Sequence, residues 1–200
     1  MQRAFRTGPA GLINSRRYDM INRITAKRRK EGDPMSEIRR ENITIPHTEQ
    51  VVPYRLVPVD GTMTARITAL DRLNHAPDPI TQEELREQLE NLNASYIAAV
   101  SESGELLGYA GLQVVLDEGY LMNLTVKERY RRQGLGTELV SVFLRFGQVN
   151  LSFLNLTCRA SHTGTQAFFR RLGFSAVGTR TDFFGEPDED GILMTMKFAQ

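Results

Sequence analysis

The stretch YLMNLTV at residues 120–126, continued by KERY at 127–130 and RRQGLGT at 131–137, decides the fold of this chain. Its pattern predicts a strand, a short basic turn and then a helix over 135–146 with apolar residues at helical spacing. The first N–H groups of a helix have no partner within the helix, so a turn of this kind is able to bind an anion such as phosphate.

Four residues of the turn suit a phosphate. Gly134 and Gly136 allow a ligand to approach the backbone closely, and Arg131 and Arg132 add positive charge. The turn lacks the Gly-Lys-Ser/Thr ending of a Walker loop and the three glycines of the dinucleotide fingerprint. A plain strand-to-helix turn with solvated arginines stays open as the alternative, because Gly-containing turns are common.

Upstream of this stretch, the apolar pattern predicts a strand, two helices and two more strands. Pro53 and Pro58 punctuate the first strand, over 51–59, which suits an edge position in a sheet. The second helix begins with a capping box at 81–84. The first helix, within 60–75, has its apolar residues on one face, at Met63, Ile67, Leu70 and Leu73. The two strands that follow span 95–100 and 106–116.

Downstream, the pattern predicts a strand, a helix and two closing strands, which completes an α/β domain without internal repeats. The strand covers 151–158, and the helix over 163–172 is stopped by Gly173. The closing strands span 175–183 and 192–198. Cys158 falls in the strand over 151–158 and has no activating partner nearby in the sequence, so we expect it to pack in the core.

The composition excludes several classes of protein. A single Cys cannot form an internal disulfide or a Cys-rich zinc site, so a disulfide-stapled secreted scaffold is excluded. No run approaches the roughly 18 apolar residues of a spanning helix. The content of 40% hydrophobic and 24% charged residues is that of a globular protein. We therefore expect a cytoplasmic protein with no metal and no membrane partner.

Charge is unevenly distributed, although the net charge is only +1. Residues 1–40 contain 11 Lys and Arg against 4 Asp and Glu, whereas residues 41–200 are mildly acidic. We predict a basic, mostly disordered extension at 1–48 and a folded domain at 49–200. Contact with nucleic acid or the ribosome, a targeting presequence, and a segment without function, with Met20 or Met35 as the true start, stay open for the extension.

The pattern Arg131-x-x-Gly134-x-Gly136 resembles the pyrophosphate-binding signature of the GNAT family of N-acetyltransferases. The order of the predicted elements over 53–198 is similar to that family as well. Further segments resemble its ribosomal-protein alanine N-acetyltransferases: QVVLDE (113–118), LTCRASH (156–162), AFF (167–169), LGF (172–174) and DGILM (190–194). The resemblance implies the GNAT fold, an α/β fold with a mixed central sheet, a splayed parallel strand pair and flanking helices.

The resemblance also implies that acetyl-CoA binds where the strands at 120–126 and 151–158 splay apart. His162 stands where the family has an Asn that contacts the cofactor, and a helix-capping or surface role for it stays open. The pantetheine arm would bond the backbone of Leu124, Thr125 and Val126. The turn that would hold the pyrophosphate consists of Arg131, Arg132, Gln133, Gly134, Leu135, Gly136 and Thr137.

The catalytic positions depart from the family. Thr157 stands where the subgroup has a Glu base, and Phe169 stands where it has a Tyr acid, so neither side chain can exchange the proton. Tyr120 and Glu118 are our candidate catalytic residues, against plain strand packing and a solvated turn carboxylate. Catalysis by positioning and a backbone oxyanion donor alone also stays open, since a thiol with a pKa near roughly 8.5 leaves readily as thiolate.

Three functions follow from these observations. The first is acetyl transfer to the N-terminal α-amine of a protein, with an Ala-starting ribosomal protein as the implied substrate. The second is transfer to another amine, on a small metabolite or a lysine. The third is a catalytically silent acetyl-CoA-binding module whose basic extension docks on RNA or the ribosome. For substrate binding, the resemblance points to Phe183 and Phe184, which replace a Tyr-Tyr pair of the family.

Overall fold

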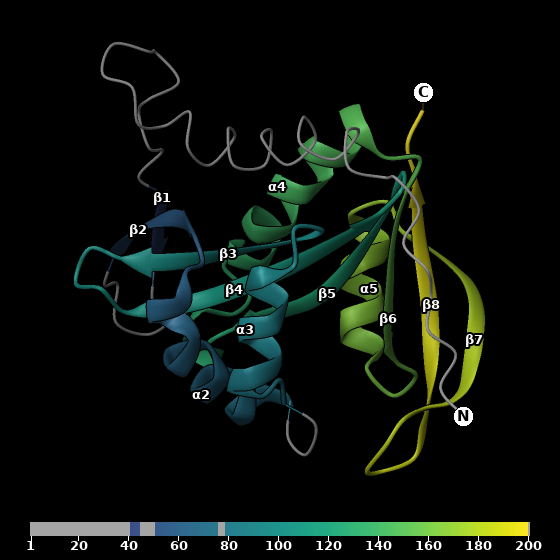
Figure 1. Ribbon diagram of the computed structural model, residues 1–200, viewed down its shortest axis with the longest axis horizontal. Coiled ribbons are helices and arrows are strands. Elements are labelled where there is room, and N and C mark those ends of the chain that lie inside the picture. The colour runs from purple at the N-terminus through teal and green to yellow at the C-terminus, as the bar shows by residue number, and fades with distance from the viewer. Residues whose placement is uncertain (1–40, 45–50, 76–78, 200) are drawn as a thin grey trace.

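The computed structural model describes residues 41–44, 51–75 and 79–199. In this part of the chain, one sheet runs in the order β1-β2-β3-β4-β5-β6-β8-β7, with helices against both faces (Figure 1). The strands are β1 (Glu41–Thr44), β2 (Val51–Pro58), β3 (Ala94–Ser101), β4 (Leu106–Val115), β5 (Glu118–Val126), β6 (Phe153–Arg159), β7 (Ser175–Phe184) and β8 (Glu189–Lys197). The helices are α2 (Thr64–His75), α3 (Gln82–Glu90), α4 (Leu135–Asn150), α5 (Thr163–Arg171) and the short 3-10 turns η2 (Gly61–Met63) and η3 (Glu128–Tyr130).

Among the described strands, β5 and β6 form the one parallel pair. Their pairing covers β5 only from Glu118 to Tyr120, whereas β5 continues to Val126. Met122 is an extra residue of β5 relative to β4, and a bulge of this kind bends its strand. The two strands therefore meet at one end and separate at the other, as Figure 1 shows. The predicted splayed parallel pair is confirmed.

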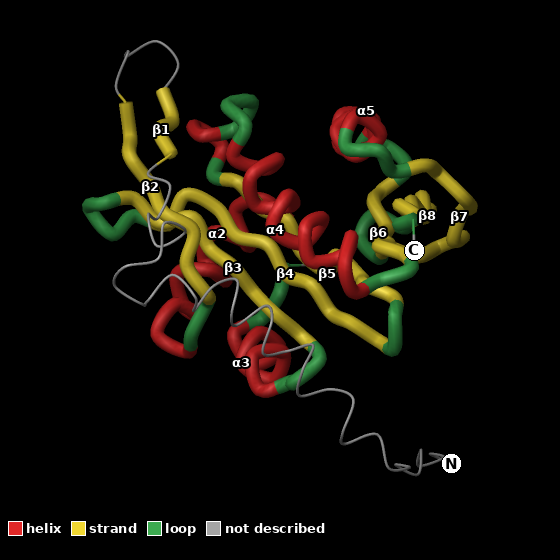
Figure 2. Tube along the Cα trace, turned by 90° about the horizontal axis from the view of Figure 1, so that it is seen from above, coloured by secondary structure: helices red, strands yellow, loops and turns green. Residues whose placement is uncertain are grey.

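The two faces of the central strands pack against different helices (Figure 2). On one face, Leu139 and Phe143 of α4 are fully buried in a cluster that also includes Phe169 of α5. On the other face, Ile67 of α2 and Leu85 of α3 are fully buried in a second cluster. Burial of a Leu, Ile or Phe side chain contributes about 1.5–3 kcal/mol relative to exposure, so these residues hold the helices on the sheet.

The predicted helices and strands are all present in the described residues, with ends shifted by a few positions. The predicted capping box of α3 is confirmed. The Thr81 hydroxyl accepts a hydrogen bond from Glu84 N at 3.2 Å, and the Glu84 carboxylate accepts one from Thr81 N at 2.8 Å. This reciprocal pair satisfies two N–H groups at the start of the helix, which is why the local sequence alone located it.

Two details of the sequence prediction were wrong. Strand β2 is not the edge of the sheet, because β1 pairs with its first half, residues 51–54, while β3 pairs with residues 54–58. A proline removes only one ladder donor, so Pro53 still pairs with Asn42 of β1. The predicted inner face of α2 also fails at its end. Leu73 is 83% exposed, while Asp71, a charged residue, is only 1% exposed and accepts hydrogen bonds from Tyr109 of β4 and Thr125 of β5.

Strand β1 lies inside residues 1–48, the range that we predicted as a basic extension. The rest of that range, with Met20 and Met35, lies outside the described residues, and so does any contact of the extension with nucleic acid. No described helix has the length and apolar character needed to cross a membrane.

Candidate active site

A cavity of about 260 Å³ opens where β5 and β6 separate. Both strands, α2, α5 and the end of β7 contribute to its walls. From the predicted site it brings together Leu124, His162 and Phe184, and it also includes Thr157 and Phe169. The other lining residues are Asp71, His75, Ile80, Leu121, Met122, Asn123, Leu156, Cys158, Arg159 and Thr165.

The predicted phosphate turn has the backbone geometry that an anion site needs. Gly134 has φ +90° and caps α4, a conformation that side chains with a Cβ rarely adopt. A Cβ on Gly134 would meet no atom within 4 Å, so the space beside it is open. The first hydrogen bond of the helix runs from Glu138 N to Gly134 O, so the N–H groups of residues 135–137 precede the bonded ladder.

The turn sits at the open end of the strand gap. A Cβ built on Gly136 would lie 3.8 Å from Cγ2 of Val126, the last residue of β5, and 3.5 Å from Cζ of Phe168 in α5. The start of α4 therefore faces both β5 and α5 at the end where these elements are apart. An extended anionic ligand is able to enter the gap with its charged end on this turn.

The three arginines of the turn region have different partners. Arg131 donates through Nε to Val126 O at 3.0 Å and contacts the Asn74 amide oxygen, so it ties the end of α2 to the end of β5. Arg129 is paired with Glu105. Arg132 forms no ion pair or side-chain hydrogen bond with the described residues, which leaves its guanidinium available for a ligand phosphate.

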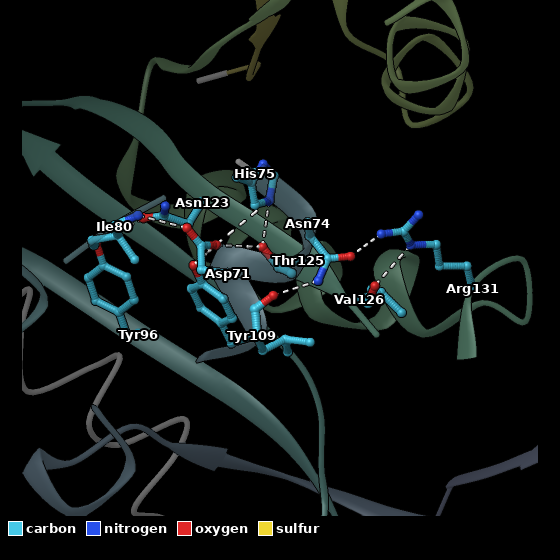
Figure 3. Close-up of polar contacts among 11 residues, drawn as sticks. Asp71, Asn74, His75, Ile80, Tyr96, Tyr109, Asn123, Thr125, Val126 and Arg131 are labelled. Atoms are coloured by element: carbon cyan, nitrogen blue, oxygen red, sulfur yellow. Dashed lines mark hydrogen bonds and ion pairs between the residues drawn. The ribbon is translucent and has the colours of Figure 1, made fainter. Parts of the chain in front are cut away.

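Beneath β5 lies a polar cluster that the sequence analysis missed (Figure 3). The buried Asp71 carboxylate accepts hydrogen bonds from the Tyr109 hydroxyl, from Thr125 Oγ1 at 3.0 Å and from Ile80 N at 2.8 Å. His75 Nε2 lies 2.7 Å from Thr125 Oγ1. The available signal was Asp71, four residues before His75 in the same helix. A charged residue on the inner face of a helix needs a buried polar partner, so this spacing indicates a polar cluster.

Burial shifts the pKa values of the groups around Asp71. Burial lowers the pKa of His75, and nearby Arg131 and His162 lower it further, against the opposing charge of Asp71. Burial, with the charge of Asp71, raises the pKa of Tyr96 to about 12. The pKa of Tyr109 is raised for the same reasons and by its hydrogen bond to Asp71. Both phenols thus keep their protons and act as donors.

The predicted catalytic pair lies outside the cavity lining, at the end of β5 that is paired with β6. The Tyr120 hydroxyl donates to Glu118 Oε2 at 2.7 Å, and this bond, with some burial, raises the pKa of Tyr120. Asn155 Nδ2 lies 3.4 Å from the same carboxylate oxygen. The structure therefore brings the two candidates together, and each is a hydrogen-bond partner of the other.

On the β6 side, the cavity wall is short of groups that exchange protons. Thr157 and Phe169 line it, and Phe169 is buried edge-on against Phe174 at 5.3 Å between ring centroids. Cys158 is buried in the core, as predicted, and burial raises the pKa of its thiol. His162 occupies the N-cap position of α5 without a capping hydrogen bond from its side chain.

Arg159 fixes the β7–β8 hairpin beside the cavity. Its guanidinium donates to Gly185 O at 3.0 Å and Pro187 O at 3.1 Å, and it pairs with Glu189 at 3.2 Å. It also lies 4.7 Å from the ring centroid of Phe184. Of the two predicted substrate residues, Phe184 lines the cavity, whereas Phe183 lies beside it on the outer surface and is 40% exposed.

Comparisons with known proteins agree with this geometry. The chain matches the sequence model of the Acetyltransferase (GNAT) family over residues 65–174. It is 33% identical over 103 residues to the [ribosomal protein bS18]-alanine N-acetyltransferase of Escherichia coli K12, covering 50% of this chain and 70% of that protein.

Solved structures show the same fold. The crystal structure of the ribosomal-protein-S18-alanine N-acetyltransferase from Escherichia coli superposes with a TM-score of 0.67 at 25% identity, over 74% of this chain and 95% of that chain. Arabidopsis thaliana NAA60 in complex with acetyl-CoA superposes with a TM-score of 0.64 at 17% identity, over 72% and 98% of the two chains.

Proposed function

This chain belongs to the acetyltransferase (GNAT) family and is an N-acetyltransferase, and we propose that its acceptor is the N-terminal α-amine of a protein. The observation that carries the proposal is the cavity between β5 and β6, with the anion-binding turn at its open end. The Escherichia coli relative is named for alanine acetylation of ribosomal protein bS18. We therefore propose an Ala-starting terminus, such as that of a ribosomal protein, as the acceptor.

The residues of the gap fit acetyl-CoA as the cosubstrate. When bound, acetyl-CoA supplies the acetyl group as an activated thioester. The N–H groups of residues 135–137 and the Arg132 guanidinium suit its pyrophosphate, and Gly134 leaves the space that close approach requires. The edge of β5 from Leu124 to Val126 has no partner in β6, so its backbone is available to an extended pantetheine arm.

The acceptor would enter beside the β7–β8 hairpin. Phe184 forms part of the cavity wall and is held there by Arg159. Phe183 extends this apolar surface outward. We propose that both rings contact the first residues of the acceptor chain, while His162 contacts the cosubstrate from the N-cap of α5.

A peptide assay tests the acceptor. The purified chain and acetyl-CoA are incubated with an Ala-starting peptide that also contains a lysine, and with the same peptide blocked at its N-terminus. Mass spectrometry should locate the acetyl group on the α-amine, and the blocked peptide should remain unmodified. Labelling of the lysine would overturn the proposal in favour of another amine. Intact acetyl-CoA binding without any turnover would identify a silent binding module.

Two glycine variants test the cosubstrate site. We expect Gly134→Glu to weaken acetyl-CoA binding about 100-fold, which is about 2.7 kcal/mol, because a carboxylate would occupy the pyrophosphate site. Gly104→Glu is the matched control, since Gly104 has a similar φ of +83° and open space around it, in the turn between β3 and β4. Calorimetric titration measures both. A wild-type Kd for Gly134→Glu would contradict the assignment.

A further inference from the structure

The side chains of Asp71, Thr125 and His75 form a chain of contacts that ends at the cavity (Figure 3). Asp71 is 1% exposed and Thr125 is 2% exposed, so the inner part of the chain is buried. The His75 side chain is 42% exposed and lines the cavity. One end of this chain is therefore fixed by packing, and the other end is accessible to an acceptor.

The hydrogen bonds determine where the imidazole carries its proton. Thr125 Oγ1 donates its one hydrogen to Asp71 Oδ1 at 3.0 Å. The 2.7 Å contact between Thr125 Oγ1 and His75 Nε2 must then use a hydrogen on Nε2. A neutral imidazole has one N–H, so Nδ1 holds a free lone pair. The two ring nitrogens face in different directions, and Nδ1 is thus turned away from Thr125.

The same cavity lacks other groups suited to accept a proton from an amine. Thr157 and Phe169 have no basic atom, and the Asp71 carboxylate already accepts three hydrogen bonds. Arg159 is a donor engaged with the β7–β8 hairpin. Apart from His75, the remaining imidazole is His162, which has no carboxylate or hydroxyl partner to fix its tautomer among the described residues.

We propose that His75 is the proton acceptor for acetyl transfer, with Thr125 and Asp71 as positioning residues; this inference rests on the proposed function. The acceptor ammonium gives one proton to His75 Nδ1, and the freed nitrogen lone pair forms the C–N bond to the thioester carbonyl carbon. The C–S bond breaks with its electron pair going to sulfur, and the second amine proton neutralises the thiolate. The imidazolium then returns its proton to water.

The surroundings of His75 keep its ring neutral. Burial lowers its pKa from the ordinary value of 6.5, and the facing charges of Arg131, beyond the end of β5, and His162, at the start of α5, lower it further. Asp71, on the same helix, opposes this shift but is outweighed. The pKa of His75 therefore lies below 6.5, so the base form predominates at neutral pH. The acid limb of the pH profile of kcat/KM should accordingly lie below pH 6.5.

Kinetics of three variants test the role. Gln at position 75 retains an N–H donor for Thr125 but is not a base, so His75→Gln separates proton transfer from positioning. We expect His75→Gln and His75→Ala each to lower kcat about 100-fold and to lose the acid limb, with the KM for acetyl-CoA within twofold of wild type. Leu73→Gln, on the exposed side of α2, is the matched control and should keep wild-type kinetics. A wild-type kcat for His75→Gln would overturn the proposal.

A measurement without turnover tests the tautomer. In protein with ¹⁵N-labelled histidine, NMR should show His75 as neutral Nε2–H at pH 7, with the signal assigned by its loss in His75→Gln. An Nδ1–H tautomer or a protonated ring would overturn the inference. Acetyl transfer by the wild type to lysine would refute the α-amine acceptor. The role of His75 would then be tested by the kcat of His75→Gln with the lysine substrate. Wild-type turnover with an unaffected His75→Gln variant would refute only the role of His75.

Discussion

Two tyrosine–carboxylate pairs, one beside strand β5 and one on it, have the same chemistry and different surroundings. Tyr109 and Asp71 are both buried, and their hydrogen bond joins β4 to α2 beside the open end of the strand gap. Tyr120 and Glu118 lie on β5 itself, at its closed end, where Tyr120 is 37% exposed. Water competes for the second pair and not for the first, so the buried pair contributes far more to stability.

The comparison also explains what each pair is able to do. In the exposed pair, Tyr120 donates to Glu118, whose carboxylate also accepts from Asn155, and both members of the pair stand outside the cavity lining. The buried pair is connected to the cavity by hydrogen bonds. Asp71 also accepts a hydrogen bond from Thr125, and Thr125 contacts His75, which lines the cavity. The buried carboxylate therefore influences the site through Thr125 and His75.

Removal of Asp71 should have the largest effect. Asp71→Ala leaves the Tyr109 hydroxyl, the Thr125 hydroxyl and Ile80 N without their acceptor, at a cost of about 3–5 kcal/mol in the free energy of unfolding. Urea denaturation measures this loss. Asp188→Ala, an exposed acid in the β7–β8 turn, is the control and should change stability by less than about 0.5 kcal/mol. Equal effects of the two variants would contradict the contrast between buried and exposed carboxylates.

Local sequence patterns were sufficient for much of this fold. The capping box at 81–84 and the glycine at 134 act through the backbone nearby, so their residue types reveal their roles directly. The splayed strands came from the resemblance to a known family, which the order of elements supported. Each of these features depends on contacts within a few residues or on a recognised motif.

The polar cluster could not be predicted in the same way. The partners of Asp71 are 38 residues away at Tyr109 and 54 residues away at Thr125, and only the folded sheet brings them together. The apolar spacing predicted that Leu73 faces inward, because a pattern of apolar residues assigns charged residues such as Asp71 to the surface. Tyr120 and Glu118 were conspicuous for the opposite reason, since they are two residues apart in one strand.

Removal of one donor from the buried pair should have an intermediate effect. Tyr109→Phe keeps the packing of the ring and leaves Asp71 with two of its three donors, so we expect a loss of about 1–2 kcal/mol in the free energy of unfolding. The Tyr109 hydroxyl shares Asp71 Oδ1 with Thr125, but its removal leaves the Thr125–Asp71 and Thr125–His75 contacts in place, so kcat should fall by less than about threefold. Urea denaturation and the peptide assay measure the two quantities. A loss as large as that of Asp71→Ala would show that the Tyr109 bond alone accounts for the stability of the cluster.

The exposed pair should give the smallest effect. Tyr120→Phe removes one hydrogen bond at the surface of the sheet, and exposed interactions of this kind contribute less than about 0.5 kcal/mol. Because the Tyr120 hydroxyl donates to Glu118 and lies outside the cavity lining, we also expect kcat to change by less than about threefold. Glu118→Gln provides the matched control, since its amide oxygen still accepts the hydroxyl.

A tenfold loss of kcat in Tyr120→Phe would contradict this expectation and would make Tyr120 a catalytic residue, as the sequence predicted. The pH profile then decides which pair acts in the reaction. A tyrosine that gives up its proton produces a basic limb, at a pH raised by the bond to Glu118. A histidine base with a lowered pKa produces an acid limb below pH 6.5. Because the two groups titrate on opposite sides of neutrality, one profile of the wild type and of both variants separates the buried pair's influence from that of the exposed pair.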